Sequence, residues 1–166
     1  MNIKEILTES TDQLNPDFVQ AVQDWQEMWN TDAAAQVILN SPESEPFRRA
    51  PRVQQLFRAI IPKDRELNAI KSNGVVVAFA TQLEGAVNFV QTLETQDDWV
   101  IVAKPFNPQD CLLDYTAMVK HYGLTDSGYV EEHEVWMRPT AQYTGAKKTE
   151  VVYTSKQHYG DETHNG

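Results

Sequence analysis

The sequence has little of several features that define common protein classes. Cys111 is the only cysteine among 166 residues, which excludes an intrachain disulfide and a thiolate-rich zinc site. No apolar run approaches the roughly 20 residues that a membrane-spanning helix needs. The first ten residues lack the apolar stretch of a signal peptide. We therefore expect a soluble, cytoplasmic protein with no membrane partner.

Positive charge and several catalytic motifs are also scarce. Lys and Arg number 14 against 24 Asp and Glu, which gives a formal net charge of -10. Binding to nucleic acid through its phosphates needs a basic surplus, so a nucleic-acid partner is not expected. Glycine-rich phosphate loops, a His-Glu-x-x-His motif and a Gly-x-Ser-x-Gly elbow are absent. The four histidines show no metal-ligand spacing, so we expect no metal cofactor.

What is present is the composition of an ordinary folded domain. Hydrophobic residues make up 41% of the chain and charged residues 23%, and the length suits one domain with its own core. We predict a single domain over residues 1–155. Residues 1–50 would form a helical cap, 51–155 a sheet core and 156–166 a flexible tail.

The first half of the chain carries clear helix signals. Asn15-Pro16-Asp17 is a typical helix start, with an Asn cap, Pro at the first position and an acid near the positive end of the dipole. Phe18, Val22, Trp25 and Trp29 then recur at helical spacing, so this helix is predicted to reach about Trp29. A second short helix is predicted over residues 33–39.

The rest of the chain mixes strand and helix patterns, so the predicted class is α+β. Strands are expected at 56–61, 75–80, 99–103, 133–137 and 150–153, and helices at 83–93 and 112–122. Residues from 155 onward have little apolar content and are expected to fray. The four tryptophans (Trp25, Trp29, Trp99 and Trp136) are expected in the core.

The segment around Glu132 and Glu134 is the first candidate site. On an extended backbone, residues two apart point to the same face, so the two carboxylates would lie together and repel each other. That cost must be offset by a cation, a proton or a function. By the same alternation His133 falls on the opposite face. A solvated acidic edge strand is the alternative interpretation.

Three motifs, in this order, resemble the arginine-serine-glutamate family of mono-ADP-ribosyltransferases, including those carried by tailed bacteriophages. Leu56-Phe57-Arg58 is similar to that family's first-strand arginine motif. Residues 78–82, followed by Ala86 and Phe89, resemble its serine-threonine-serine strand and the helix after it. Glu132-His133-Glu134-Val135 resembles its E-x-E signature. The resemblance covers about residues 53–155.

The resemblance implies a fold, a reaction and roles for particular residues. The fold would be ADP-ribosyltransferase-like, with two small packed sheets around a cleft. NAD would be the co-substrate, and an accessible arginine of a target protein the acceptor. If the chain is phage-encoded, the target would lie in the host bacterial cytoplasm. The resemblance implies that Glu134 faces the ribose and that Glu132 orients the acceptor. Arg58, Thr81 and Phe79 would bind the dinucleotide. Tyr129 would pack against the acceptor or the nicotinamide.

The sequence departs from the family pattern at three positions. Ala80 and Gln82 stand where the two serines of the middle motif are expected, and Ala59 replaces a common glycine. In the family the first serine braces the catalytic glutamate and the bound dinucleotide. Two alternatives therefore remain open: a catalytically inactive binding module whose acidic surface recognises a basic partner, and an NAD glycohydrolase that uses water as acceptor.

Overall fold

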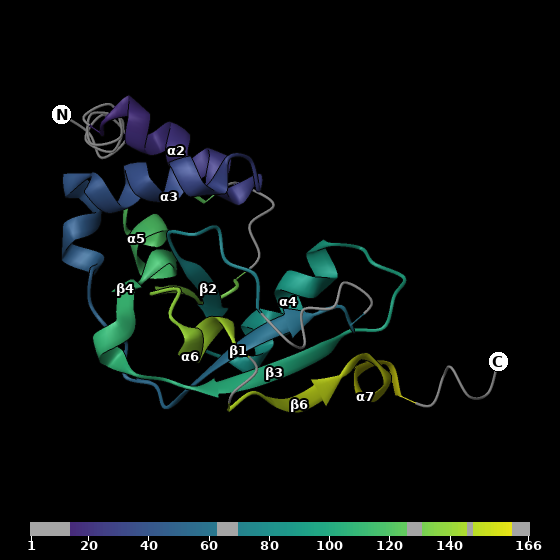
Figure 1. The fold of residues 1–166 in the computed structure, drawn as a ribbon. Coiled ribbons are helices and arrows are strands. Elements are labelled where there is room, and N and C mark those ends of the chain that lie inside the picture. The colour runs from purple at the N-terminus through teal and green to yellow at the C-terminus, as the bar shows by residue number, and fades with distance from the viewer. Residues whose placement is uncertain (1–13, 63–69, 126–130, 146–147, 161–166) are drawn as a thin grey trace.

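The structure, a computed structural model, describes residues 14–62, 70–125, 131–145 and 148–160 and is of the α+β class (Figure 1). Its strands are β1 Gln55–Ile60, β2 Val77–Ala80, β3 Val100–Pro105, β4 Cys111–Leu113, β5 Glu134–Met137 and β6 Glu150–Thr154. Its α-helices are α2 Pro16–Gln26, α3 Thr31–Asn40, α4 Leu83–Thr92, α5 Tyr115–His121, α6 Ala141–Thr144 and α7 Ser155–Tyr159. Two 3-10 turns, η1 Pro42–Phe47 and η3 Pro108–Asp110, complete the described elements.

The strands form one antiparallel six-stranded sheet in the order β4-β5-β2-β1-β3-β6, so the prediction of two separate sheets is wrong. The two halves of the sheet nevertheless meet at a narrow junction. β1 pairs with β3 over six residues, whereas β1 and β2 share only the pair Phe57 and Ala80. That single residue pair joins β4-β5-β2 to β1-β3-β6.

The helix start predicted at Asn15 is confirmed. The Asn15 side chain accepts a hydrogen bond of 2.8 Å from the main-chain N–H of Asp17, and Pro16 opens α2. The helix ends at Gln26, earlier than predicted, because the chain turns sharply into α3 through left-handed residues at Met28 (φ 59°) and Asn30 (φ 45°). Trp29 lies in this corner and is 65% exposed, so its assignment to the core is wrong.

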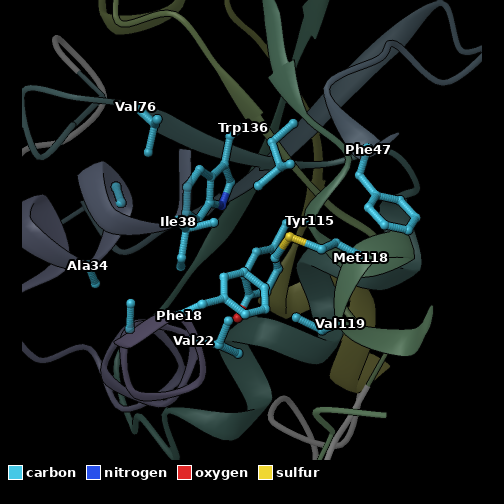
Figure 2. Packing of buried hydrophobic residues seen from close by; sticks show 13 residues of the cluster. Phe18, Val22, Ala34, Ile38, Phe47, Val76, Tyr115, Met118, Val119 and Trp136 are labelled. Carbon is cyan, nitrogen blue, oxygen red and sulfur yellow. The ribbon is translucent and has the colours of Figure 1, made fainter. Parts of the chain in front are cut away.

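Helices α2 and α3 lie side by side and cover one end of the molecule (Figure 1). A hydrophobic cluster lies between these two helices on one side and α5 and the β2-β5 part of the sheet on the other. It includes Phe18, Ile38, Tyr115, Met118 and Trp136 (Figure 2). Burial of this much apolar surface fixes α2 against the sheet. Helices α2 and α3, called the helical front end below, are therefore packed into the same domain as the strands.

The helix predicted over residues 112–122 begins three residues later. Cys111–Leu113 instead form β4, which pairs with β5 through Cys111 with Met137 and Leu113 with Trp136. Asp114 then caps α5, because its carboxylate accepts a hydrogen bond of 3.3 Å from the Ala117 N–H. A pairing with residues more than twenty positions away decides the strand, and the local pattern does not contain it.

The prediction of a frayed tail from residue 155 is wrong for Ser155–Tyr159, which form α7. The Thr154 hydroxyl caps this helix by accepting from the Gln157 N–H at 3.2 Å. Ser155 is buried, and its hydroxyl accepts from the Trp99 N–H at 3.0 Å. The rings of His158 and Tyr159 pack on Trp99. None of the helices in the described ranges combines the length and the apolar character that crossing a membrane requires.

Candidate active site

A cavity of about 680 Å³ lies between the helical front end and α4. Arg58 on β1, Glu134 at the start of β5 and Glu132 just before it all line this cavity. They also line a smaller adjoining cavity of about 100 Å³, whose other walls are mostly apolar. Three residues singled out from the sequence are thus brought to one place, although 76 positions separate Arg58 from Glu134.

Arg58 lies beside the narrow junction between the halves of the sheet. Its guanidinium Nη1 donates a hydrogen bond of 2.8 Å to the main-chain carbonyl of Ala78 on β2. Because the strands share only one residue pair here, this bond connects β1 to β2 where ladder pairing has ended. Arg58 therefore has a structural contact as well as a place in the cavity wall.

Glu134 is held on both its main chain and its side chain. Its N–H donates to the hydroxyl of Thr116 on α5 at 2.6 Å. Its carboxylate oxygen Oε2 accepts two hydrogen bonds of 2.7 Å, one from the indole Nε1 of Trp25 and one from the indole Nε1 of Trp136. The first of these donors comes from α2, so a residue of the helical front end contacts the candidate catalytic carboxylate directly.

Glu132 is positioned through its main chain by helix α4. Gly85, in the first turn of α4, packs so closely on the Glu132 carbonyl that a β-carbon at position 85 would clash with it. Asn88, one turn later, donates from its side-chain amide to the Glu131 carbonyl at 2.8 Å. Both contacts fix the segment that leads into β5.

The sequence predicted that the two glutamates lie on one continuous extended segment, and the structure shows that they do not. His133 adopts a left-handed conformation with φ 50°, and β5 begins only at Glu134. The simple alternation that placed the carboxylates on one face therefore does not hold, yet both still reach the cavity. The His133 ring turns to Glu131, with its Nδ1 3.4 Å from a carboxylate oxygen.

Burial is the main cause of a raised pKa in both carboxyl groups. Burial, and to a lesser extent the charge of Glu134, raise the pKa of Glu132 to about 7. The pKa of Glu134 is raised to about 6, because burial outweighs the opposite effects of the Trp136 and Trp25 indoles and the charge of Arg58. At pH 7 Glu134 is therefore mostly ionised, whereas Glu132 is divided between its two forms.

The other residues implied by the resemblance lie differently. Thr81 is not among the residues that line either cavity, and its hydroxyl and N–H donate to the His133 carbonyl at 3.3 and 2.9 Å. Phe79 borders the smaller cavity, but its ring is 3% exposed and packs edge-on to Tyr143. Tyr129 lies outside the described residues. Thr81 thus orients the glutamate segment, and Phe79 supports the wall behind it.

One feature of the site was not expected from the sequence, and a second was implied only by the family resemblance. Trp25 was assigned to the core on its helical spacing, and nothing local indicated a contact with a residue 109 positions away. Ala80, expected to stand in place of a bracing serine, is paired directly with Glu134 across β2 and β5. A side chain at position 80 therefore points to the same face as Glu134, beside it.

Within the described ranges, no group of three or more His, Cys, Asp or Glu side chains is arranged to hold a metal ion. No protein-family model, curated protein or solved structure matches the chain.

Proposed function

We propose that the cavity binds NAD and that the protein transfers ADP-ribose from it to an arginine of a target protein. The observation that carries the proposal is the convergence of Arg58, Glu132 and Glu134 on one cavity. Its volume of about 680 Å³ falls within the roughly 300–1,000 Å³ that ligand pockets span. The small adjoining cavity, bordered by Phe57 and Phe89, suits a planar ring such as nicotinamide.

In the proposed reaction the bond between the nicotinamide nitrogen and ribose C1′ breaks, and its electron pair leaves with the nicotinamide. Positive charge develops on the ribose, as in glycoside hydrolysis. An ionised carboxylate fixed near that charge stabilises the transition state more than the ground state. Glu134 is suited to this role because its carboxylate is mostly ionised at neutral pH and is held by two donors.

Glu132 is proposed to act on the acceptor. A guanidine nitrogen of the target arginine attacks C1′, forms the new C–N bond and gives up a proton. A carboxyl group whose pKa is about 7 is close to the optimum for a general base at neutral pH. Arg58 is proposed to hold a phosphate or ribose oxygen of NAD.

The test is to incubate the purified protein with NAD and a host extract, and to measure both released nicotinamide and protein-bound ADP-ribose. We expect nicotinamide release in both the presence and the absence of extract, with labelling of a protein only in its presence. Glu134→Gln serves as the matched control and should be inactive in both assays. Absence of both products with the wild-type protein would contradict the proposal.

A catalytically inactive binding module is the second candidate, and Ala80 favours it. This residue pairs with Glu134 and has no hydroxyl with which to brace it. Such a module would keep the cavity and bind NAD or a basic partner without breaking the glycosidic bond. The same assay separates the candidates, because a binding module releases no nicotinamide while NAD still stabilises the fold.

A further inference from the structure

The carboxylate of Glu134 has an unusual set of hydrogen-bond donors. Both described donors are indole N–H groups, and both bind the same oxygen, Oε2, at 2.7 Å. They come from different parts of the chain, Trp25 from α2 and Trp136 from β5. The two rings contact each other, with their centroids 4.3 Å apart.

We propose that Trp25 and Trp136 are positioning residues that fix the Glu134 carboxylate through Oε2 and direct its other oxygen, Oε1, toward the ribose. This inference rests on the proposed function, since it assigns how the catalytic carboxylate of that reaction is held. It also assigns a role in the site to the helical front end, because Trp25 belongs to α2.

Indole N–H groups suit this task for a physical reason. The group is a donor only, so it bonds to a carboxylate without offering an acceptor to a protonated acid. Hydrogen bonds to an ionised partner are shorter and stronger than neutral ones. Two of them on one oxygen favour the ionised form that the reaction needs, against burial, which favours the protonated form.

The indoles are themselves held rigidly. Trp136 is fully buried, and the ring of Tyr115 stacks on it at a centroid distance of 5.3 Å and an angle of 11° (Figure 2). Trp25 packs against both rings, with its centroid 4.3 Å from that of Trp136 and 6.2 Å from that of Tyr115. Rings locked by packing hold their N–H groups in fixed directions, which is the requirement for a preorganised site.

The same arrangement accounts for the missing hydroxyl at Ala80. A serine there would lie across the β2-β5 pair from Glu134, within reach of its carboxylate. In the structure, Trp25 and Trp136 supply the hydrogen-bond donors to this carboxylate instead. The bracing function can thus be kept although the residue that would provide it has been replaced.

Other charged or titratable groups face Glu134 and must be considered in any pH measurement. Arg58 on β1, Lys71 before β2, Glu132 before β5 and Tyr115 on α5 line the same cavity. Arg58 lowers the pKa of Glu134, and the pair Glu132 and Glu134 repel each other. A Glu132→Gln background removes the second titrating carboxyl group, so the remaining titration belongs to Glu134.

The first experiment needs no activity. In Glu132→Gln protein, the indole N–H signals of the four tryptophans are followed by nitrogen-proton NMR as pH is raised. We expect two of the four, those of Trp25 and Trp136, to move together with one midpoint near that of Glu134. Trp25→Phe keeps a ring but removes one donor, so the proton affinity of Glu134 should rise about tenfold. The midpoint of the remaining Trp136 signal should then shift upward by roughly one pH unit. An unchanged midpoint would overturn the inference.

Trp29→Phe is the matched control, since Trp29 follows the same helix but is 65% exposed. It should leave the Trp25 and Trp136 titrations unchanged. Because Trp25→Phe could also loosen the fold, Trp136→Phe provides a second variant that removes the other donor from the same oxygen. Both variants should show the same upward shift of the titration midpoint. A midpoint shift of equal size in Trp29→Phe would contradict a specific contact.

The second experiment measures nicotinamide release. Trp25→Phe should lower the rate at pH 7 by about 10- to 100-fold, since one charge-assisted hydrogen bond is lost. Ala80→Ser in the Trp25→Phe background should recover part of that loss. Failure of the rescue together with an unchanged pH profile would overturn the inference. Inactivity of the wild type would instead contradict the proposed function and leave the NMR result to decide the role of the indoles.

Discussion

Glu132 and Glu134 lie two residues apart, yet different contacts hold them. The side chain of Glu134 is fixed by two indoles and its N–H by Thr116. The position of Glu132 is set by contacts of the neighbouring main chain with Gly85 and Asn88. An immobile carboxylate suits electrostatic stabilisation, whereas a carboxyl group with a pKa near neutrality suits proton transfer. The two residues are therefore expected to respond differently to the same substitution.

Glu134→Gln and Glu132→Gln should separate the two steps of the proposed reaction. Glu134→Gln removes the charge facing the ribose and should suppress nicotinamide release and transfer alike, by about 2–4 kcal/mol in transition-state stabilisation. Glu132→Gln should abolish transfer to arginine but keep slow hydrolysis of NAD to water. Chromatography of nicotinamide together with a radiolabel on the acceptor measures both. Equal loss of both reactions in Glu132→Gln would exclude this division of roles.

The raised pKa of Glu132 predicts opposite pH trends for activity and stability. Transfer should rise as pH passes through about 7, because the ionised form of Glu132 is the base. A folded-state pKa raised above the ordinary 4.5 means that the folded protein binds more protons between these values, so this group lowers stability as pH rises from 4.5 to 7. Glu132→Gln should therefore be more stable than wild type at pH 8, by about 3 kcal/mol, and no more stable at pH 4. Urea unfolding at both pH values measures the difference, and a constant difference would contradict the assignment.

At the scale of elements, helix α4 is the part that sets the position of the glutamate segment. Gly85→Ala places a β-carbon where the Glu132 carbonyl lies, so the helix or the segment must move. We expect a loss of about 1–3 kcal/mol in unfolding free energy and a larger fall in transfer than in NAD binding. Glu84, one residue earlier in α4, has an exposed side chain, so Glu84→Ala is the control. It should leave the transfer rate and NAD binding unchanged. Wild-type activity in Gly85→Ala would show that α4 does not position Glu132.

Elements whose signals are local could be predicted from the sequence, and those that depend on distant contacts could not. The start of α2 follows from Asn15-Pro16-Asp17, and β2 lies within the apolar run at 75–80. β4 depends on pairing with β5, and α7 depends on packing against Trp99. The left-handed His133, which ends the alternation of the two glutamates, has no glycine to mark it.

At the scale of the molecule, the site is assembled from both halves of the sheet and from the helical front end. Arg58 belongs to the β1-β3-β6 half, Glu134 to the β4-β5-β2 half, and Trp25 to α2. The sequence motifs indicated that Arg58 and Glu134 would approach each other, and they line the same cavity. The contribution of Trp25 could not be predicted, because it depends on how α2 packs against the sheet through the shared hydrophobic cluster.

This assembly predicts how NAD binding should change the stability of the whole protein. A ligand bound only by the folded state stabilises it by about 2.7 kcal/mol at one hundred times its dissociation constant. For a domain of this size, that corresponds to a rise of roughly 5–10 °C in melting temperature. Arg58→Ala should remove most of this rise, because Arg58 is proposed to hold a phosphate or ribose oxygen of NAD.

Arg58 also bonds to the Ala78 carbonyl at the junction of the sheet, so Arg58→Ala should melt earlier even without NAD. The informative quantity is therefore the difference between melting temperatures with and without NAD for each variant. Arg48→Ala is a matched control, since Arg48 likewise donates from its guanidinium to a main-chain carbonyl, that of Ser41 at 3.0 Å, but does not line the cavity. It should lower the melting temperature while keeping the full NAD-dependent rise. If Arg58→Ala keeps that rise as well, Arg58 only joins the two halves of the sheet, and the dinucleotide must be held by other residues of the cavity.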